Sequence, residues 1–371
     1  MQRRVYLRSL TATVGAVGAT GCLRTAGDEP TTTTEQPRFR TETVTMELEV
    51  PWGAAFAPDG DLYLTERPGR VQRVAHENGR KEQIADLTDV VAARGEGGLL
   101  GLAIHPGNSD IAYTYQTYEG QNGLTNRVVR HRISDDFVRE SVVFDGIPGA
   151  SIHDGGRIAF GPGGSSGASD GALYVATGDA GESGLAQDRE SLAGKVLRLT
   201  PDGEPHPDNP FGNAVFTYGH RNPQGLAWRE GTLFSTEHGP SSDDEINVLR
   251  AGNNYGWPEA MGPTDGGRFT DPIESYTPAI APGSATFYHG PVEDWRGDFF
   301  FGTLAGTHLH RVRIDDNGNV VGQQRLLDGK YGRLRTVFTG PEDHLYVTTS
   351  NRDGRGTPAP QDDRVLRIQP V

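Results

Sequence analysis

Short apolar stretches with alternating polar positions recur along the chain from Pro51 to its end. The first copy, Trp52-GAAFAPDGDLYLTE followed by Gly69-RVQRV, has one apolar stretch, a Pro/Gly/Asp turn and a second stretch centred on an aromatic residue. Apolar–polar alternation over four to eight residues between turn residues is typical of β-strands. The pattern therefore predicts an all-β protein built from units of three or four short strands.

The unit occurs six times. Its central aromatic residues recur at intervals of 46 to 66 residues, at Tyr63, Tyr113, Tyr174, Phe234, Phe300 and Tyr346. A period near fifty residues with three or four strands per unit is typical of β-propeller blades. A sandwich of short strands is the general alternative for an all-β sequence, but it does not explain the repeat. We therefore predict a six-bladed β-propeller over residues 41–371, in which the segment Thr43-VTMELEV closes the ring with the last blade.

The first forty residues are predicted to be a targeting segment and a tether. An Arg3–Arg4 pair followed by a small, mildly apolar stretch resembles a twin-arginine export signal over residues 1–22. The run Ala-Thr-Gly before Cys22 resembles a lipobox, and the alternative is an ordinary cleaved signal with an incidental cysteine. Residues 23–40 are rich in threonine and proline and are predicted to be a disordered linker. We expect an exported protein on the outer face of the cytoplasmic membrane, attached to it only through a lipid anchor at Cys22.

The charge and cysteine content narrow the range of partners. The chain has 35 basic and 49 acidic residues, a net charge of −14, so we expect no nucleic-acid partner. Lys81, Lys195 and Lys330 are the three lysines, and arginine supplies the other basic residues. An acidic chain almost free of lysine is typical of halophilic adaptation, and a GC-rich genome is the alternative explanation. The single cysteine, Cys22, excludes an internal disulfide.

Polar clusters interrupt the repeat in loops, and the loops of a propeller converge at the mouth of its central tunnel. The clusters are Arg94-GEGGLLG, Ser151-IHDGGR, Tyr218-GHRNPQG, Glu237-HGPSSDDEINVLRAGNNYGWP and Arg333-Leu334-Arg335. Arginines such as Arg221, Arg333 and Arg335 are bidentate donors that match carboxylates. The loops therefore predict a site for a planar polyanion.

Hard oxygen ligands of the kind that Ca²⁺ prefers gather in the fourth cluster. They are Glu237, Asp243, Asp244 and Glu245, with the carbonyls exposed near Gly239 and Pro240. A solvated acidic loop is the alternative for Asp243 and Asp244. His153 has no Ser or Cys partner in its loop, so a hydrolytic triad is poorly supported. We expect its ring to face the tunnel and to act as a base near neutral pH.

These clusters resemble, in the same order and over about residues 48–371, those of soluble quinoprotein glucose dehydrogenase and the related aldose sugar dehydrogenases. GHRNPQG and DEIN…NYGWP are the most specific runs. The resemblance implies a six-bladed propeller that binds pyrroloquinoline quinone (PQQ) and Ca²⁺ at the tunnel mouth. It also implies oxidation of the C1 hydroxyl of aldose sugars to lactones, with transfer of the electrons to an external acceptor.

The same resemblance implies roles for single residues. His153 matches the histidine that takes the proton from the C1 hydroxyl, and Arg335 matches the arginine that assists hydride transfer to the quinone. The implied cofactor-binding residues are Glu96, Arg221, Asn222, Thr303, Leu304, Ala305, Arg333, Leu334 and Arg335. The catalytic calcium would be held by the carbonyls of Gly239 and Pro240, and a second calcium by Glu245 and the main-chain oxygen of Tyr255.

Three positions depart from the glucose dehydrogenase pattern. Glu96 replaces a glutamine that contacts the cofactor, Ile152 replaces an aspartate that orients the histidine, and Ala305 replaces a lysine. A non-catalytic propeller that binds a glycan or protein through the same mouth is the alternative, because the hedgehog-interacting protein resembles this domain and works by binding. His153 and the arginines favour the dehydrogenase, whereas Glu96 and Ala305 favour the binding protein.

Overall fold

The computed structural model describes residues 39–134, 137–162, 171–264 and 266–371. The predicted signal, the lipobox at Cys22 and most of the predicted tether lie outside the described residues. Within the described part, no helix is long and apolar enough to cross a bilayer.

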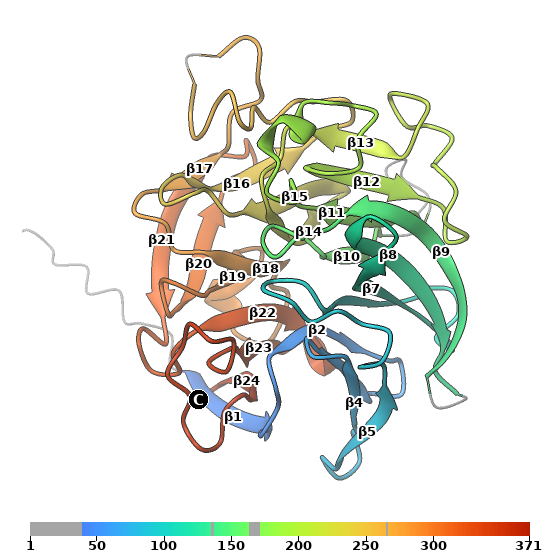
Figure 1. Cartoon of the computed structure of the whole chain (residues 1–371). Helices are drawn as coiled ribbons and strands as arrows, with labels where there is room; N and C mark the ends of the chain where they lie inside the picture. The colour runs from blue at the N-terminus through green and yellow to red at the C-terminus, as the bar shows by residue number, and fades with distance from the viewer. Residues whose placement is uncertain (1–38, 135–136, 163–170, 265) are drawn as a thin grey trace, which may run out of the picture. The chain divides into compact units, whose positions relative to one another are not determined.

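Six four-stranded antiparallel sheets make up the described chain, which confirms the predicted six-bladed β-propeller (Figure 1). Blades one to three are β2 (Pro51–Phe56), β3 (Leu62–Glu66), β4 (Arg70–Val74), β5 (Lys81–Asp86); β6 (Leu99–Ile104), β7 (Ile111–Gly120), β8 (Gly123–Arg132), β9 (Val138–Pro148); and β10 (Ile158–Phe160), β11 (Leu173–Thr177), β12 (Lys195–Leu199), β13 (Val215–Tyr218). Blades four to six are β14 (Pro223–Arg229), β15 (Thr232–Glu237), β16 (Asp244–Leu249), β17 (Glu274–Tyr276); β18 (Pro282–Phe287), β19 (Phe299–Thr303), β20 (Leu309–Ile314), β21 (Val320–Leu326); and β22 (Leu334–Thr339), β23 (Leu345–Thr349), β24 (Val365–Pro370), β1 (Phe39–Thr45). Three short 3-10 helices lie in loops, at Ser183–Ala186, Glu293–Trp295 and Pro341–Asp343.

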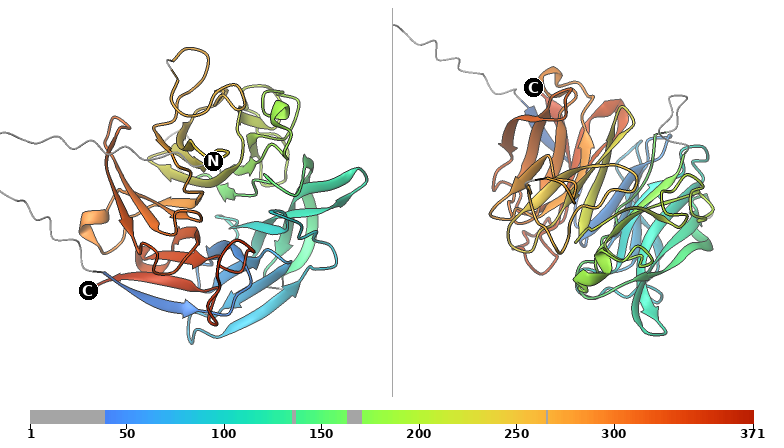
Figure 2. Two further views of the ribbon diagram at one scale, coloured as in Figure 1. Left: turned by 60° about the vertical axis from the view of Figure 1, so that its left-hand side comes forward. Right: turned by 90° about the horizontal axis from the view of Figure 1, so that it is seen from above.

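The first and last strands close the ring. β1 pairs antiparallel with β24, and the two strands lie side by side in Figure 2. β1 begins at Phe39 and ends at Thr45, so the closing strand lies earlier than the predicted segment that starts at Thr43. Innermost strands of neighbouring blades contact each other, including β2 with β22, and between blades three and four β11 contacts β14. A propeller leaves only short, protected sheet edges, which limits edge-to-edge association.

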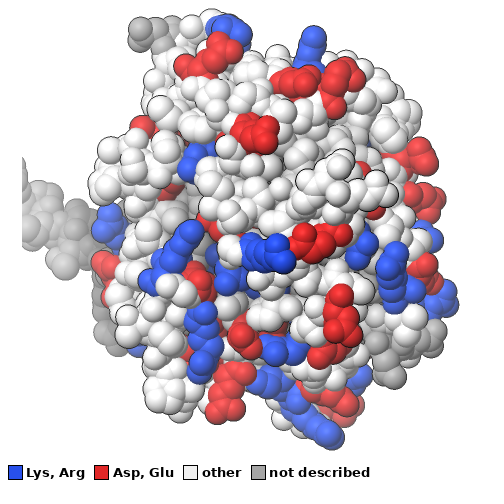
Figure 3. Space-filling view, viewed as in Figure 1, with Lys and Arg blue, Asp and Glu red and all other residues white. Residues whose placement is uncertain are grey.

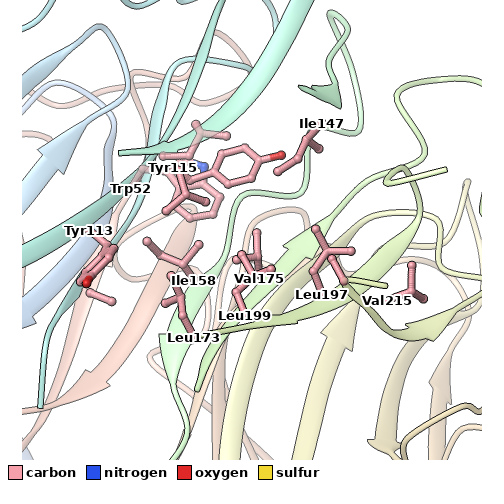
Figure 4. Close-up of a cluster of buried hydrophobic side chains, with 14 residues drawn as sticks. Trp52, Tyr113, Tyr115, Ile147, Ile158, Leu173, Val175, Leu197, Leu199 and Val215 are labelled. Carbon is pink, nitrogen blue, oxygen red and sulfur yellow. The ribbon is translucent and has the colours of Figure 1, made fainter. Parts of the chain in front are cut away.

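The repeating aromatic residues hold the blades together. Tyr63, Tyr113, Tyr174, Phe234, Phe300 and Tyr346 each lie on the second strand of a blade, and all six are buried. The largest apolar cluster joins blades two and three with Trp52 of blade one, and it includes Tyr115 and Leu197 (Figure 4). Aromatic side chains bury a large area each, so one such residue per blade supplies much of the packing between sheets.

Strand direction decides where the polar loops meet. Adjacent strands are antiparallel, so loops from the second to the third strand of a blade emerge at the same end as loops from the fourth strand to the next blade. Four of the five polar clusters predicted from the sequence, and the first part of the Glu237 cluster, fall in loops or strand ends of these two kinds. The rest of that cluster, residues 250–258, lies in the β16–β17 loop, from which Trp257 reaches Asp179. The fold therefore gathers them at one end of the ring.

Candidate functional site

A cavity of about 280 Å³ lies at this end of the ring. Residues from blades one, two, four, five and six and the loops between them line it: Trp52, Arg67, Gly95, Glu96, Asp154, Gly155, Gln224, His238, Ala281, Leu304, Arg333, Arg335, Asp353, Gly354 and Arg355. Figure 3 shows basic side chains close to the centre of this face, beside acidic ones. Four arginines thus line the mouth of a protein that is acidic overall.

Two arginines flank Trp52 in the cavity wall. The guanidinium carbons of Arg157 and Arg335 lie 4.2 and 5.7 Å from the centroid of the indole ring. Arg335 donates hydrogen bonds to Ser350 Oγ and Gln224 Oε1, which are neutral acceptors. Burial lowers the pKa of Arg157 to about 9 and the pKa of Arg335 to about 10. Positive charge is thus held under the cavity without a directly paired carboxylate, which favours an anionic ligand.

His153 lies in the β9–β10 loop with its side chain 14% exposed. Its φ of 57° is in the left-handed region, which is uncommon for a residue other than glycine. Gly178 packs against it, since a Cβ there would lie 1.8 Å from the His153 carbonyl oxygen. The His153 N–H donates to Glu96 Oε2 at 2.9 Å. The main chain at His153 is therefore held by Gly178 on one side and by Glu96 on the other.

The tautomer of His153 follows from its two ring partners. Arg221 Nη2 lies 2.8 Å from His153 Nε2, and a guanidinium can only donate, so Nε2 carries the lone pair. His153 Nδ1 therefore carries the proton and donates it to Asp179 Oδ1 at 2.7 Å. The structure presents a neutral imidazole with Nε2 as its basic atom, which is the form that a general base needs.

Asp179, which the sequence analysis did not single out, orients this histidine. It follows β11, and its carboxylate also accepts hydrogen bonds from Trp257 Nε1 and the Gly181 N–H, both at 2.8 Å. Burial raises the pKa of Asp179, but its hydrogen bond from His153, the His153 charge and the other two donors outweigh burial and lower it. Ile152 is 41% exposed. Ile152 replaces the orienting aspartate of the glucose dehydrogenase pattern, and Asp179 supplies an orienting carboxylate from another blade.

Arg221 joins the candidate base to the predicted calcium loop. Its Nη1 donates to Gly239 O at 2.7 Å and to His238 O at 3.1 Å, and its guanidinium lies 5.4 Å from the Trp257 ring. Asn222 accepts from the Gly155 N–H at 3.1 Å, and its Nδ2 lies 3.4 Å from Glu96 Oε2. Arg221, Asn222 and His153 thus meet at one point, as the sequence predicted.

Asp244 positions the Gly239–Pro240 loop. Its Oδ1 accepts from the Gly239 N–H at 2.8 Å, and its Oδ2 accepts from the N–H groups of Ile280 and Ala281 at 2.6 and 2.7 Å. These donors engage both oxygens, so Asp244 holds the loop in place, and its role as a metal ligand stays a prediction. The Gly239 carbonyl oxygen, by contrast, accepts a hydrogen bond from the positively charged Arg221. The same oxygen is therefore suited to be a ligand of a metal cation.

Glu245 and its neighbours form a second oxygen-rich centre. Glu245 Oε1 accepts from the Gly262 N–H at 2.8 Å and Oε2 from Asn247 Nδ2 at 3.0 Å. Burial and then the charge of Glu237 raise the pKa of Glu245 to about 8. The buried Asn247 Oδ1 has no hydrogen-bond partner in the described structure. Two buried carboxylates beside an unpaired carbonyl oxygen fit a bound divalent cation.

The side chain of Tyr255 is used in packing, so its predicted metal ligand is the main-chain oxygen. The ring stacks on His220 at 4.8 Å, and the hydroxyl donates to Val248 O at 2.7 Å. His220 Nδ1 in turn lies 2.8 Å from Glu237 Oε2. Over the described ranges, no group of three or more His, Cys, Asp and Glu side chains has a metal-binding arrangement, so any metal here needs carbonyl ligands.

A model of the glucose/sorbosone dehydrogenase family matches residues 48–358. The chain belongs to this family. It is 39% identical to PQQ-bound aldose sugar dehydrogenase from Streptomyces coelicolor, whose structure superposes with a TM-score of 0.80 and covers 90% of this chain and 99% of that one. It is 31% identical to aldose sugar dehydrogenase YliI of Escherichia coli over 84% of this chain and 90% of that protein. It is 34% identical to quinoprotein glucose dehydrogenase B of Acinetobacter calcoaceticus over 61% of this chain, which spans about half (54%) of that protein.

The family resemblance predicted from the sequence is thus confirmed, and the predicted cofactor positions of this glucose/sorbosone dehydrogenase family member divide into two groups. Glu96, Leu304, Arg333 and Arg335 line the cavity, and Arg333 donates to Leu304 O at 3.0 Å. The other five positions are absent from the lining, and of these Arg221 and Asn222 contact His153 and Gly155 instead. The Thr303 hydroxyl donates to His308 O, Leu334 is buried in an apolar cluster, and Ala305 does not line the cavity.

Asp154, beside His153, gives a first testable prediction. Its Oδ1 accepts from Asn126 Nδ2 and the Ala150 N–H, while its buried Oδ2 has no partner within the described residues. Burial raises the pKa of Asp154 to about 7. A folded-state pKa above the unfolded one stabilises the protein at low pH, and this contribution is lost as pH rises from about 4 to 7.

We therefore expect Asp154→Asn to match the wild type in unfolding free energy at pH 4 and to exceed it by about 2–4 kcal/mol at pH 8. Urea denaturation of both proteins across this range measures the difference. A difference that stays constant with pH would contradict the assignment of a protonated Asp154.

Proposed function

We propose that the protein is a PQQ- and Ca²⁺-dependent dehydrogenase that oxidises the C1 hydroxyl of aldose sugars to lactones and passes the electrons to an external acceptor. The observation that carries the proposal is the arrangement of His153, a neutral imidazole held by Asp179 with Nε2 as its basic atom. This arrangement occurs at the mouth of a propeller whose relatives include a PQQ-bound aldose sugar dehydrogenase.

The residues at the mouth fit a planar tricarboxylate beside a divalent cation. Arg335 has neutral hydrogen-bond partners, so its charge is available to an anion. The carbonyl oxygen of Gly239 already accepts from a cationic donor, and Pro240 beside it is exposed. Arg221, Asn222, Arg333 and Arg335 would hold the quinone, and the carbonyls of Gly239 and Pro240 would hold the calcium. Glu245 and the main chain of Tyr255 would hold a second calcium.

When bound, the quinone with its calcium supplies an electrophilic carbon that accepts hydride. His153 Nε2 takes the proton of the C1 hydroxyl, so that negative charge develops on the sugar oxygen as the C1 hydrogen leaves with its electron pair. Asp179 accepts the hydrogen bond from Nδ1 throughout and stabilises the imidazolium that forms. Arg335 contributes positive charge beside the reacting atoms.

Arg221 has to release His153 before a sugar can bind productively. Its Nη2 donates to the Nε2 lone pair, which is the atom that the sugar hydroxyl must reach. A cation at Gly239 would compete with Arg221 Nη1 for the same carbonyl oxygen. We infer that loading of calcium and the anionic cofactor draws Arg221 away from Nε2 and exposes the base.

Reconstitution tests the proposed function. Purified protein is treated with EDTA, supplied with PQQ with or without CaCl₂, and assayed with glucose and other aldoses and an artificial electron-accepting dye. We expect turnover only when quinone, calcium and aldose are all present, with the lactone as product. Tight quinone binding without turnover on any aldose would contradict the sugar dehydrogenase assignment, and absence of quinone binding would favour the binding-protein alternative.

A further inference from the structure

We propose that Arg67 and Arg355 form an additional carboxylate-binding subsite at the cavity mouth. This inference rests on the proposed function for the identity of its ligand, because the carboxylate belongs either to the cofactor or to an acidic sugar. Neither arginine belongs to the polar positions for which the sequence predicted a function.

Some arginines that line the cavity pair with a carboxylate and others do not. Arg333 pairs with Asp353 at 2.8 Å, and Arg355 pairs with Glu96 at 3.1 Å. Arg67 lines the same cavity, but in the described part of the chain its guanidinium makes no hydrogen bond or ion pair. Arg335 has no carboxylate partner either. Among the residues described, Arg67 and Arg335 therefore have no paired carboxylate, whereas Arg355 would exchange its exposed pair with Glu96 for the carboxylate of the ligand.

The main chain fixes Arg67 in place. It lies between β3 and β4, where its N–H donates to Val50 O at 3.1 Å and its carbonyl accepts from the Leu99 N–H at 2.9 Å. Gly98 packs directly on it, with a positive φ of 149°, and a Cβ there would lie 2.3 Å from Arg67 O and 2.7 Å from Arg67 Cγ. The start of this side chain is therefore held against the cavity wall.

Charges of both signs surround Arg67. Burial lowers its pKa, the charges of Asp353, Glu96 and Glu49 oppose this, and Arg355 adds to the lowering. Arg67 is likewise among the groups that lower the pKa of Arg335. Guanidinium groups brought together at an electrostatic cost are relieved by an anion between them, and a planar carboxylate matches their donors.

Arg355 brings the second donor from a distant part of the chain. It lies in the β23–β24 loop with its side chain 64% exposed, and its partner Glu96 also accepts from the His153 N–H. A carboxylate bound by Arg67 and Arg355 would therefore lie near the candidate base. An acidic group of the cofactor and one of the substrate are both possible at this position, and they require separate measurements.

The test uses Arg67→Met, which removes the charge and keeps the length, and Arg67→Lys, which keeps the charge and loses the planar donor set. Arg73→Met is the matched control, because Arg73 is a half-exposed arginine of the same blade that pairs with Asp61 away from the cavity. Removing an unpaired, partly buried cation should not lower stability, so we expect Arg67→Met to melt at or above the wild-type temperature. A lower melting temperature would assign Arg67 a structural role and overturn the proposal.

Two readouts distinguish the sources of the carboxylate. The first is the dissociation constant of PQQ for the apo-protein at fixed calcium, and the second is the ratio of kcat/KM for glucuronate to that for glucose. A cofactor carboxylate predicts a Kd at least tenfold weaker in Arg67→Met, with partial recovery in Arg67→Lys and an unchanged ratio. A substrate carboxylate predicts an unchanged Kd and a ratio at least tenfold lower. If neither quantity changes relative to Arg73→Met, the subsite does not exist.

Failure of the proposed function remains distinguishable from failure of the subsite. If wild-type protein binds no quinone, it is titrated with glucuronate and glucose by calorimetry. This titration decides whether the carboxylate-binding subsite exists. Binding of glucuronate but not glucose that is lost in Arg67→Met would support the subsite without the dehydrogenase. No binding of glucuronate would overturn the subsite.

Discussion

Substitution of His153 by glutamine is expected to lower kcat by about 10²- to 10⁴-fold, the range typical of a lost general base. Glutamine is close in size and keeps polar atoms near Asp179, but it provides no basic atom in place of Nε2. Cofactor binding should be retained, because the guanidinium groups that would hold the quinone are untouched. The measurement is steady-state turnover of the reconstituted enzyme, together with the Kd for quinone.

His76→Gln is the matched control for this prediction. His76 lies exposed in the turn between β4 and β5, away from the cavity, so its substitution should leave both quantities unchanged. Turnover of His153→Gln within threefold of the wild type would contradict the role of His153. A loss of quinone binding in this variant would instead show that His153 supports the cofactor site.

Asp179→Asn is expected to lower kcat by about three to four orders of magnitude, as in the serine-protease example of an aspartate that fixes a histidine tautomer. The Asp179 carboxylate accepts from three donors: His153 Nδ1, Trp257 Nε1 and the Gly181 N–H. An amide has one oxygen and one NH₂ group, so it must point the NH₂ group at one of these donors. It either loses the Trp257 bond or forces His153 into the tautomer with the proton on Nε2.

The nitrogen-15 chemical shifts of the His153 ring report this change directly, alongside kcat. The wild type should show protonated Nδ1 and unprotonated Nε2, and Asp179→Asn should show the reverse or a mixture. Asp188→Asn, in the same loop, is the control, since Asp188 accepts from the Glu190 N–H and does not contact His153. An unchanged tautomer with full activity would contradict the positioning role of Asp179.

Much of the fold could be predicted from the sequence because one strand of each blade has a strong local signal. The buried aromatic residues from Tyr63 to Tyr346 all lie on second strands, where both faces of the sheet are covered. The outermost strands lacked such a signal. β5 and β21 are exposed at alternate or adjacent positions and carry mostly polar residues, so their pattern differs little from that of a loop.

The innermost strand of blade five, β18, was also missed, for another reason. Its sequence PGSATF has few large apolar residues, because it packs closely on neighbouring strands. A Cβ on Gly283 would lie 2.0 Å from Arg335 O, so small residues are required there. Close backbone packing of this kind removes the hydrophobic pattern that sequence analysis uses.

The residues of the candidate site were likewise predicted only in part. His153, Arg221, Arg333 and Arg335 were predicted because they lie in loops that break the repeat. Asp179 was missed because it directly follows β11 in a segment that fits the repeat. Arg67 and Arg355 were missed because their significance depends on which charges they meet in space, and Arg355 pairs with a residue 259 positions away in the sequence.

Anaerobic single turnover tests the central claim most directly. Wild-type protein and His153→Gln are loaded with PQQ and Ca²⁺ without an electron acceptor and are then mixed with an aldose while the quinone absorbance is followed. The account predicts rapid conversion to the quinol spectrum in the wild type, with one lactone formed per quinone. In His153→Gln, the quinone spectrum should persist although the cofactor stays bound. Persistence of the oxidised spectrum in the wild type, or equally fast reduction in both proteins, would contradict the account.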